Sequence, residues 1–306
     1  MMKSALASVN ERIPLLAYLL LAAVSIWWAS SYVLIKIAVV EVPPATLATA
    51  RLLVASAVLL AWLRLGENRP LPTDLRSWTG YALIALFGHA LPLYLIAWAS
   101  MAVPVTEMSI LVATTPVFAV LFAFVARREW PPRMTVFGLL AGLFGVAAVL
   151  GHPDIPMSYT NASALPRLAL LGAAASYALS GRVVARLGEA NAVVTVTAVM
   201  ICAIPMLLPL SLGFERPWTI HPRAEAVAAL LLLGVMSTAV VYVAYYRLIG
   251  LSGPAFASTH HYLVPALSIA LGAAFLGERL ALEQIALLTP IVLSVFIARG
   301  LISQKL

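Results

Sequence analysis

Histidines inside long apolar stretches are the residues of this sequence best suited to chemistry. His89 lies eleven residues into an apolar stretch that begins at residue 78, and His260 and His261 follow the helix-breaking pair Gly253-Pro254. An imidazole can donate or accept a hydrogen bond and titrates near neutral pH. Within a bilayer, polar groups are costly unless they face the interior of a helix bundle. The pattern favours contact with a solute, and the alternative is a histidine held by a neighbouring backbone carbonyl.

The histidine pair does not have the spacing of a metal site. Adjacent residues point about 100° apart on a helix, so we expect at most one of His260 and His261 to face the interior squarely. Without further ligands three or four residues away, neither a metal ion nor another cofactor is expected. Cys202 is the single cysteine and lies in an apolar run, which indicates a small buried side chain.

Aromatic side chains accompany these histidines. A cavity with aromatic walls and few polar groups suits amphipathic solutes, whereas rings at the ends of spans are also typical of the aromatic belt at a membrane interface. Besides His89 and His260, the predicted cavity residues are Trp28, Tyr32, Tyr94, Trp98, Tyr177, Tyr245 and Tyr262.

Three residues are predicted to act in gating. Pro116 and Pro265 each remove a backbone donor and bend a helix, and we favour bent gating helices over simple curvature of the bundle. Glu107 follows Pro104 by three residues. This position suits a gate, a proton site, or a carboxylate stabilised by the dipole of its helix.

Arg51 is the one basic residue assigned to neither side of the membrane, because it falls within the second predicted span, whereas Lys36 falls at the outer end of the first. The guanidinium of Arg51 could pair with an anion or extend toward the membrane interface. We favour a structural or packing role for Arg51 and an interfacial anchoring role for Lys36.

The elements that must position these residues are transmembrane helices. The chain has 306 residues, of which 63% are hydrophobic and 10% charged, with a mean hydropathy of +1.01. In soluble domains charged residues make up about a quarter of the total. The net charge of +7 comes from basic residues scattered between apolar runs, which indicates loops facing an anionic membrane surface instead of a nucleic-acid site.

The predicted fold class is therefore all-α, a polytopic membrane protein with ten transmembrane helices, since a span needs about 20 apolar residues. The predicted spans are residues 15–35, 45–63, 78–98, 104–125, 134–150, 166–183, 193–212, 225–246, 254–276 and 283–300. The first of them is expected to remain as a helix, because it lacks the cleavage site of a signal peptide. The short connections leave no room for a soluble domain.

The distribution of Lys and Arg predicts the orientation. With the N-terminus inside, thirteen of the nineteen basic residues face the cytoplasm, five face outward and Arg51 lies within a span. Cytoplasmic loops carry the excess of positive charge. We therefore predict a multi-pass inner-membrane protein with both termini in the cytoplasm.

The two halves of the sequence repeat each other at a spacing of 149 residues. The aligned positions are Trp28-Ala29 with Tyr177-Ala178, Pro116 with Pro265, and Glu129 with Glu278. Five spans per half is an odd number, so the second half must enter the membrane from the opposite side. The sequence thus predicts two inverted five-helix repeats, residues 1–150 and 151–306, an arrangement typical of secondary transporters with a midplane substrate site.

Three motifs carry a resemblance to a known family. They are Trp28-Ala-Ser-Ser-Tyr-Val-Leu-Ile-Lys36, Ala50-Arg51-Leu-Leu, and Leu276-Gly-Glu-Arg-Leu280. In this order, and with the repeat, the chain resembles the drug/metabolite transporter superfamily, specifically proteins with two EamA-type domains. The resemblance implies a ten-helix carrier whose bacterial members export amino acids and related metabolites through a central cavity. The first half departs from the family pattern at Arg128-Glu129-Trp130-Pro131, where the glutamate is kept.

The predicted function is export of small metabolites, most of all amino acids or their derivatives, by alternating access around that cavity. A zwitterion needs donors and acceptors together with an apolar lining, and this composition offers both. The alternative is proton-coupled efflux of drugs or organic cations, which depends on a buried glutamate, and Glu107 is shallow for that role. No motif of an intramembrane enzyme occurs, so no enzymatic activity is expected. The expected partners are a small-molecule substrate and the lipid bilayer, without nucleic acid, in a monomer or a dimer.

Overall fold

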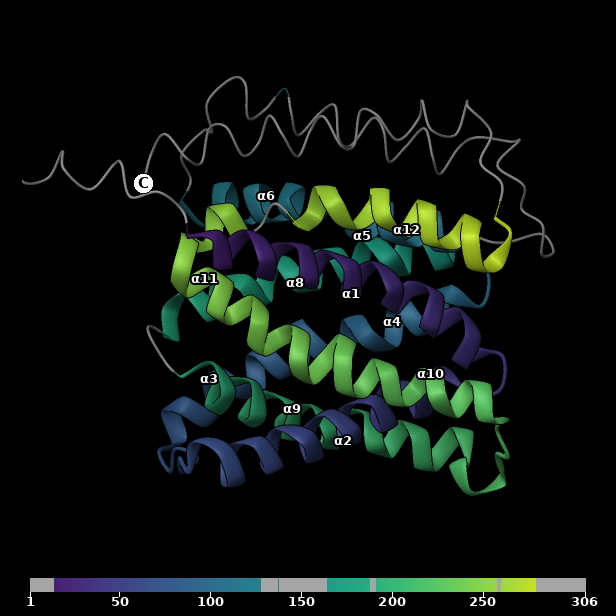
Figure 1. The fold of residues 1–306 in the computed structure, drawn as a ribbon, viewed down its shortest axis with the longest axis horizontal. Coiled ribbons are helices and arrows are strands. Elements are labelled where there is room, and N and C mark those ends of the chain that lie inside the picture. Colours follow the sequence, from purple (N-terminus) through teal and green to yellow (C-terminus); the bar gives the residue numbers. More distant parts are fainter. Residues whose placement is uncertain (1–13, 128–136, 138–163, 188–190, 258–259, 279–306) are drawn as a thin grey trace, which may run out of the picture.

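The protein is built from helices (Figure 1), as the sequence predicts for its fold class. The computed structural model describes residues 14–127, 137, 164–187, 191–257 and 260–278, and no strand occurs among them. The helices run side by side along the horizontal axis of Figure 1. Two of the predicted spans, 134–150 apart from residue 137 and 283–300, lie outside the described residues.

Helices of the first half fill the chain as far as residue 127. Their bounds are α1 Leu15–Val39, α2 Pro44–Trp62 with the π-helical turn η2 Leu63–Glu67, α3 Leu75–Ala85 with the π-helical turn η3 Leu86–Ala90, α4 Leu91–Ser100, α5 Val105–Val112 and α6 Thr115–Arg127.

Helices of the second half follow from residue 165. They are α8 Leu165–Leu187, α9 Ala192–Leu210 with the π-helical turn η4 Ser211–Glu215, the short η5 Pro217–Thr219, α10 Ala224–Gly234 with the π-helical turn η6 Val235–Val240, α11 Val241–Ala257 and α12 His260–Leu276. Within α11, Gly253 has a φ of 76°, which interrupts the helix immediately before Pro254.

Six helical stretches of the described chain are long and apolar enough to cross a bilayer. They are Leu15–Val39, Pro44–Glu67, Leu75–Ser100, Val105–Ala126, Ala192–Glu215 and Ala224–Gly253. In hydrocarbon every backbone polar group must find its partner within the protein, which a helix achieves by itself. Large apolar side chains such as Leu19, Leu168 and Phe275 point outward with 58%, 51% and 71% of their surface exposed. Such an exterior suits lipid, so the protein is a multi-pass membrane protein.

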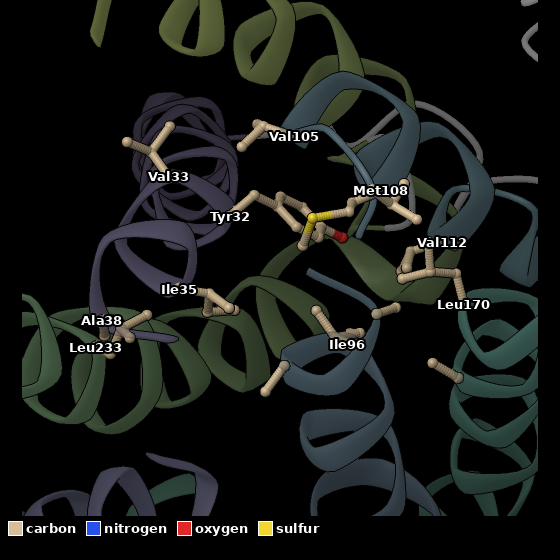
Figure 2. Close-up of a cluster of buried hydrophobic side chains, with 14 of the residues drawn as sticks. Tyr32, Val33, Ile35, Ala38, Ile96, Val105, Met108, Val112, Leu170 and Leu233 are labelled. Atoms are coloured by element: carbon tan, nitrogen blue, oxygen red, sulfur yellow. The ribbon is translucent and has the colours of Figure 1, made fainter. Parts of the chain in front are cut away.

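The largest hydrophobic cluster joins helices from both halves (Figure 2). Tyr32 of α1 and Met108 of α5 lie in it, beside Ile96 of α4, Leu170 of α8 and Leu233 of α10. These side chains expose at most 7% of their surface. The cluster fixes α1 against four other helices and so sets the position of the residues that α1 carries.

Two π-helical turns interrupt long helices where polar residues are placed. The turn η3 separates α3 from α4 and contains His89, and η6 separates α10 from α11 and contains Ser237 and Thr238. A π-helical turn inserts one residue into the helical ladder and is frequent at functional sites. At Gly88 in η3, a Cβ atom would lie 2.4 Å from Oγ of Ser180, so only glycine lets α8 approach this closely.

The helices α2 and α9 are matched in form. Each has 19 residues and runs into a π-helical turn of 5 residues. Each turn is followed by a residue with positive φ, Asn68 at 47° and Arg216 at 49°. The ends also hold each other, because the carboxylate of Glu215 accepts hydrogen bonds from the backbone N–H groups of Ala45 (2.9 Å) and Thr46 (2.6 Å) at the start of α2.

The opposite end of this helix pair has the reciprocal contact. Asn191 caps α9 by accepting hydrogen bonds from the N–H groups of Val193 and Val194. Its Nδ2 donates to Oε2 of Glu67, at the end of η2, over 2.9 Å. Thus α2 and α9 lie antiparallel, and a glutamate at the end of each one reaches the beginning of the other.

A third carboxylate links the halves at the start of α5. Glu278, which follows Gly277 (φ 65°), accepts hydrogen bonds from the N–H groups of Val105 (2.7 Å) and Thr106 (3.2 Å) and lies 3.1 Å from the Thr106 hydroxyl. The first N–H groups of a helix lack partners within the helix, and a carboxylate there also interacts favourably with the helix dipole. Glu278 therefore stabilises the entry of α5 from the second half of the chain.

Candidate substrate site

Six rings from four elements form one group, which we call the ring cluster. Its members are Trp28 of α1, His89 of η3, Tyr242 and Tyr245 of α11, and His260 and His261 of α12. The structure thus brings together four predicted cavity residues, Trp28, His89, Tyr245 and His260, from distant positions in the sequence.

Trp28 is the centre of the ring cluster. Its ring centroid lies 4.6 Å from that of His260, 5.0 Å from that of Tyr245 and 5.5 Å from that of Tyr242. Tilted and edge-on contacts of this length are the favourable arrangement for aromatic pairs. The cluster joins the first helix of the chain to α11 and α12, so it spans both halves.

His89 is buried, and its two ring nitrogens lack hydrogen-bond partners of ordinary geometry among the described residues. It exposes 3% of its surface, and its ring centroid lies 4.5 Å from that of Tyr242. The carbonyl of Ile84 interacts with the ring, but within the described part of the chain neither ring nitrogen completes a hydrogen bond of ordinary geometry. Nearly all buried polar atoms in proteins have a partner. His89 therefore has ring nitrogens available to a group that the described residues do not supply.

His260 and His261 occupy different surroundings. His260 is buried, and its Nδ1 donates to the carbonyl of Ala257 over 2.9 Å. His261 is half-buried and its ring centroid lies 4.0 Å from that of His260. The two neighbours thus stack on each other, and His260 has the backbone partner that His89 lacks.

Arg51 lies near the ring cluster. It exposes 5% of its surface. Its Nε donates to the hydroxyl of Thr238 over 2.5 Å and its Nη2 to the carbonyl of Ser237 over 3.2 Å, both in η6. The π-helical turn therefore holds a buried guanidinium that comes from the other half of the chain.

Arg51 also interacts with phenol groups and with His89. Arg51 interacts electrostatically with Tyr32, Tyr177 and Tyr242, and also with His89. The phenol groups of Tyr177 and Tyr242 also interact with each other. The predicted residues Tyr32 and Tyr177 are thus connected to the ring cluster through Arg51. The sequence did not identify Thr238 as the hydrogen-bond partner of Arg51, because the two residues are 187 positions apart.

Tyr94 and Trp98 lie on α4 at some remove from these rings. Trp98 packs against the cluster of Figure 2, as do Trp28 and Tyr177, and Tyr94 packs against a second hydrophobic cluster together with Tyr242. For the described residues, no ring contact links Tyr94 or Trp98 to the ring cluster. Tyr262 lies on α12, and its side chain is outside the described part of the structure.

The predicted gating residues have different settings. Pro116 follows a break between α5 and α6, since α5 ends at Val112 and α6 begins at Thr115. Pro265 lies within the continuous helix α12. The interruption on that side of the chain comes earlier, at Gly253. The two prolines thus occupy unlike positions in their helices.

Glu107 is buried in an ion pair that sequence reasoning missed. It lies in the first turn of α5 and pairs with Arg167 in the first turn of α8, through Nε to Oε1 and through Nη2 to Oε2 at 3.3 Å. Glu107 and Arg167 expose 6% and 8% of their surfaces. The sequence suggested a gate, a proton site or a carboxylate stabilised by the helix dipole for Glu107, and it did not identify Arg167 as a partner because 60 residues separate the two.

Comparisons with known proteins identify relatives along nearly the whole chain. The sequence model described as the EamA-like transporter family matches residues 15–151 and again residues 165–300. An uncharacterized transporter of Archaeoglobus fulgidus is 28% identical over 81% of this chain and 85% of its own length. The uncharacterized inner membrane transporter YedA of Escherichia coli is 28% identical over 87% of this chain and 85% of its own.

Another relative has a more specific name. It is a probable terminal-alkyne amino-acid exporter of Streptantibioticus cattleyicolor, 26% identical over 82% of each chain. Among solved structures, one crystal structure superposes with a TM-score of 0.65 over 95% of this chain and 99% of that chain. Its sequence identity of 19% supports a common fold alone.

Proposed function

Since the chain belongs to the EamA-like transporter family, we propose that it exports small metabolites, in the first place amino acids or their derivatives. The transport occurs by alternating access around a central site between the two halves. The substrate lies at the ring cluster, with Arg51 beside it. The membrane in question is the inner membrane, as the name of the Escherichia coli relative states for that protein.

One observation carries this proposal, namely the polar and aromatic groups gathered inside an otherwise apolar bundle. His89, Arg51 and Tyr32 are buried, Tyr177 and Tyr242 are half-buried, and together they come from helices of both halves. Polar residues inside a membrane protein mark substrate pathways. The aromatic faces of Trp28 and Tyr245 supply an apolar wall beside them, as binding an amphipathic molecule requires.

The proposed architecture is ten transmembrane helices in two inverted repeats, residues 1–150 and 151–306. It is supported by the two family matches of similar length and by the equal lengths of α2 with η2 and of α9 with η4. The reciprocal contacts of Glu67 and Glu215 at the two ends of the α2–α9 pair also fit two halves of opposite orientation. In such transporters one half rocks against the other around the site.

Amino acids are preferred over organic cations as substrates for two reasons. A relative is named as an amino-acid exporter. The carboxylate of Glu107, which an organic cation and a proton would have to share, is already engaged with Arg167. Arg51 in the interior also disfavours a positively charged substrate.

The test is transport by purified protein in liposomes. A panel of radiolabelled amino acids is offered with and without an imposed pH gradient, and protein-free liposomes serve as the control. Saturable uptake of one or a few amino acids would support the proposal, and a response to the gradient would identify proton coupling. Transport of lipophilic cations alone, by protein verified to be folded, would overturn it in favour of the alternative.

The orientation of the chain is a separate prediction. Two single-cysteine variants, Arg69→Cys and Trp218→Cys, are made in a Cys202→Ser background. Position 69 lies in a loop predicted to face the cytoplasm, and position 218 lies in a loop predicted to face outward. Both native side chains are well exposed, at 61% and 65%. In intact cells a membrane-impermeant maleimide is expected to label position 218 and to reach position 69 only after permeabilisation. Labelling of position 69 in intact cells would reverse the proposed orientation.

A further inference from the structure

Arg51 is a buried cation without a carboxylate partner in the described part of the chain. Its hydrogen bonds go to a hydroxyl and a carbonyl, from Nε and Nη2, and its Nη1 has none from the described residues. A charge removed from water is costly unless an opposite charge compensates it. Two neutral acceptors in η6 hold the side chain in place but do not neutralise it.

Arg167 provides the comparison within the same protein. It exposes 8% of its surface, close to the 5% of Arg51, and its guanidinium faces the carboxylate of Glu107 through two nitrogens. Where this chain buries an arginine at the start of a helix, it supplies the anion itself. At Arg51, in the interior of α2, the described residues do not supply one.

The groups around Arg51 are suited to an anion. Phenol hydroxyls of Tyr32, Tyr177 and Tyr242 lie within its electrostatic reach, and hydroxyl groups can donate hydrogen bonds to a carboxylate. His89 also lies within reach of Arg51, and its ring nitrogens have no satisfied hydrogen bond. A neutral imidazole has one N–H to donate.

We propose that Arg51 and His89 bind the carboxylate of the transported molecule, while the rings of Trp28 and Tyr245 contact its apolar part. This inference rests on the proposed function and specifies its substrate class as amphipathic monocarboxylates. The carboxylate is the group required for binding, and the ammonium group of an amino acid is dispensable.

Charge balance separates this class from others. One carboxylate carries the charge that neutralises the guanidinium of Arg51, so the ion pair that they form has no net charge. A phosphate dianion would leave one negative charge without a cation among the described residues of the site, where Arg51 is the one permanently charged group. An ammonium group can lie against the faces of the rings, which tolerates an amino acid without requiring one.

The experiment compares three probes that share a phenyl ring on a three-carbon chain. They are L-phenylalanine, 3-phenylpropanoate, which lacks the ammonium group, and L-phenylalaninamide, which lacks the carboxylate. Calorimetric titration of purified protein in detergent is expected to show binding of the first two and binding at least about tenfold weaker for the amide, because a hydrogen-bonded charge pair is lost. Amide binding equal to that of the acids, or no binding of any probe to folded protein, would overturn the inference.

Variants then assign the effect to Arg51. Arg51→Gln is expected to weaken the binding of both acids by about tenfold or more, and Arg51→Lys, which keeps the charge but not the planar fork, by less. The matched control is Arg64→Gln, the same change at an exposed position near the end of the same helix, which is expected to bind as the wild type does. Unchanged acid binding by Arg51→Gln would overturn the inference.

The outcome for this site can be told apart from the outcome for the proposed function. Saturable amino-acid transport that is the same in wild type and Arg51→Gln would leave the exporter standing and remove the carboxylate site. Binding of 3-phenylpropanoate that depends on Arg51, without transport of any amino acid, would keep the carboxylate site and remove the amino-acid exporter.

Discussion

Arg167→Met is expected to lower the stability of the protein by about 3 kcal/mol or more, because it leaves the buried carboxylate of Glu107 without its opposite charge. Glu107 exposes 6% of its surface, and Arg167 is its ion-pair partner in the structure. The apparent Tm in detergent should fall by about 5 °C or more. The measurement is thermal unfolding followed by tryptophan fluorescence.

The double variant Glu107→Met/Arg167→Met removes both charges at once. A buried ion pair replaced by apolar side chains of similar size is often neutral in stability, so this variant should recover most of the lost Tm. Should it instead melt as low as Arg167→Met alone, the loss would come from packing and not from the unpaired charge.

The matched control is Arg223→Met, which breaks the pair of Arg223 with Glu41. Both residues lie in connections outside the spans, and the side chain of Arg223 is 78% exposed. Hydrogen bonds from the backbone and the side chain of Arg223 lower the pKa of Glu41 below its ordinary value. Because water can solvate Glu41 once Arg223 is lost, the Tm should stay within experimental error.

His89→Leu is expected to reduce transport about tenfold while raising stability by about 1 kcal/mol. The ring nitrogens of His89 have no satisfied hydrogen bond in the described structure, so an apolar side chain of similar volume removes the cost of burying them. The same change removes a donor to the substrate. Transport is measured in liposomes with the amino acid that the wild type carries best, and stability by the apparent Tm.

A fall in transport together with a rise in stability distinguishes a binding residue from a structural one. A histidine that holds the fold together would lower both the Tm and the transport rate when replaced, and that result would contradict the role proposed for His89. His221→Leu is the control, because His221 is an exposed loop histidine, and both quantities should stay unchanged there.

Hydrophobic pattern predicted the helices well, because apolar length is a local property of the sequence. Six predicted spans coincide with helical stretches that can cross a bilayer, for example 193–212 with Ala192–Glu215. The resemblance to EamA-type proteins is confirmed by the family match. The π-helical turns η3 and η6 were not predicted, since the residues within them, such as Gly88 and Thr238, are not distinctive in type.

Sequence reasoning singled out the histidines and aromatic residues of the candidate site, but it did not identify the partners of the charged residues. Rings attract attention by type, so Trp28 and Tyr245 could be singled out from the sequence. Pairing cannot be seen there, because the partner of Arg51 lies 187 positions away and that of Glu107 lies 60 away. Arg51 was assigned to packing for this reason. Tyr94 and Trp98 were included as aromatic residues of a helix whose rotation the sequence does not specify.

The antiparallel pair of α2 and α9 has a mechanical consequence. Glu215 fastens one end of the pair and Glu67 the other. Because the two helices are hydrogen-bonded at both ends, one can rotate against the other but cannot slide lengthwise without breaking one of these contacts. For the alternating access proposed above, we therefore expect the other helices to tilt about this pair, and we do not expect one half to move lengthwise past the other.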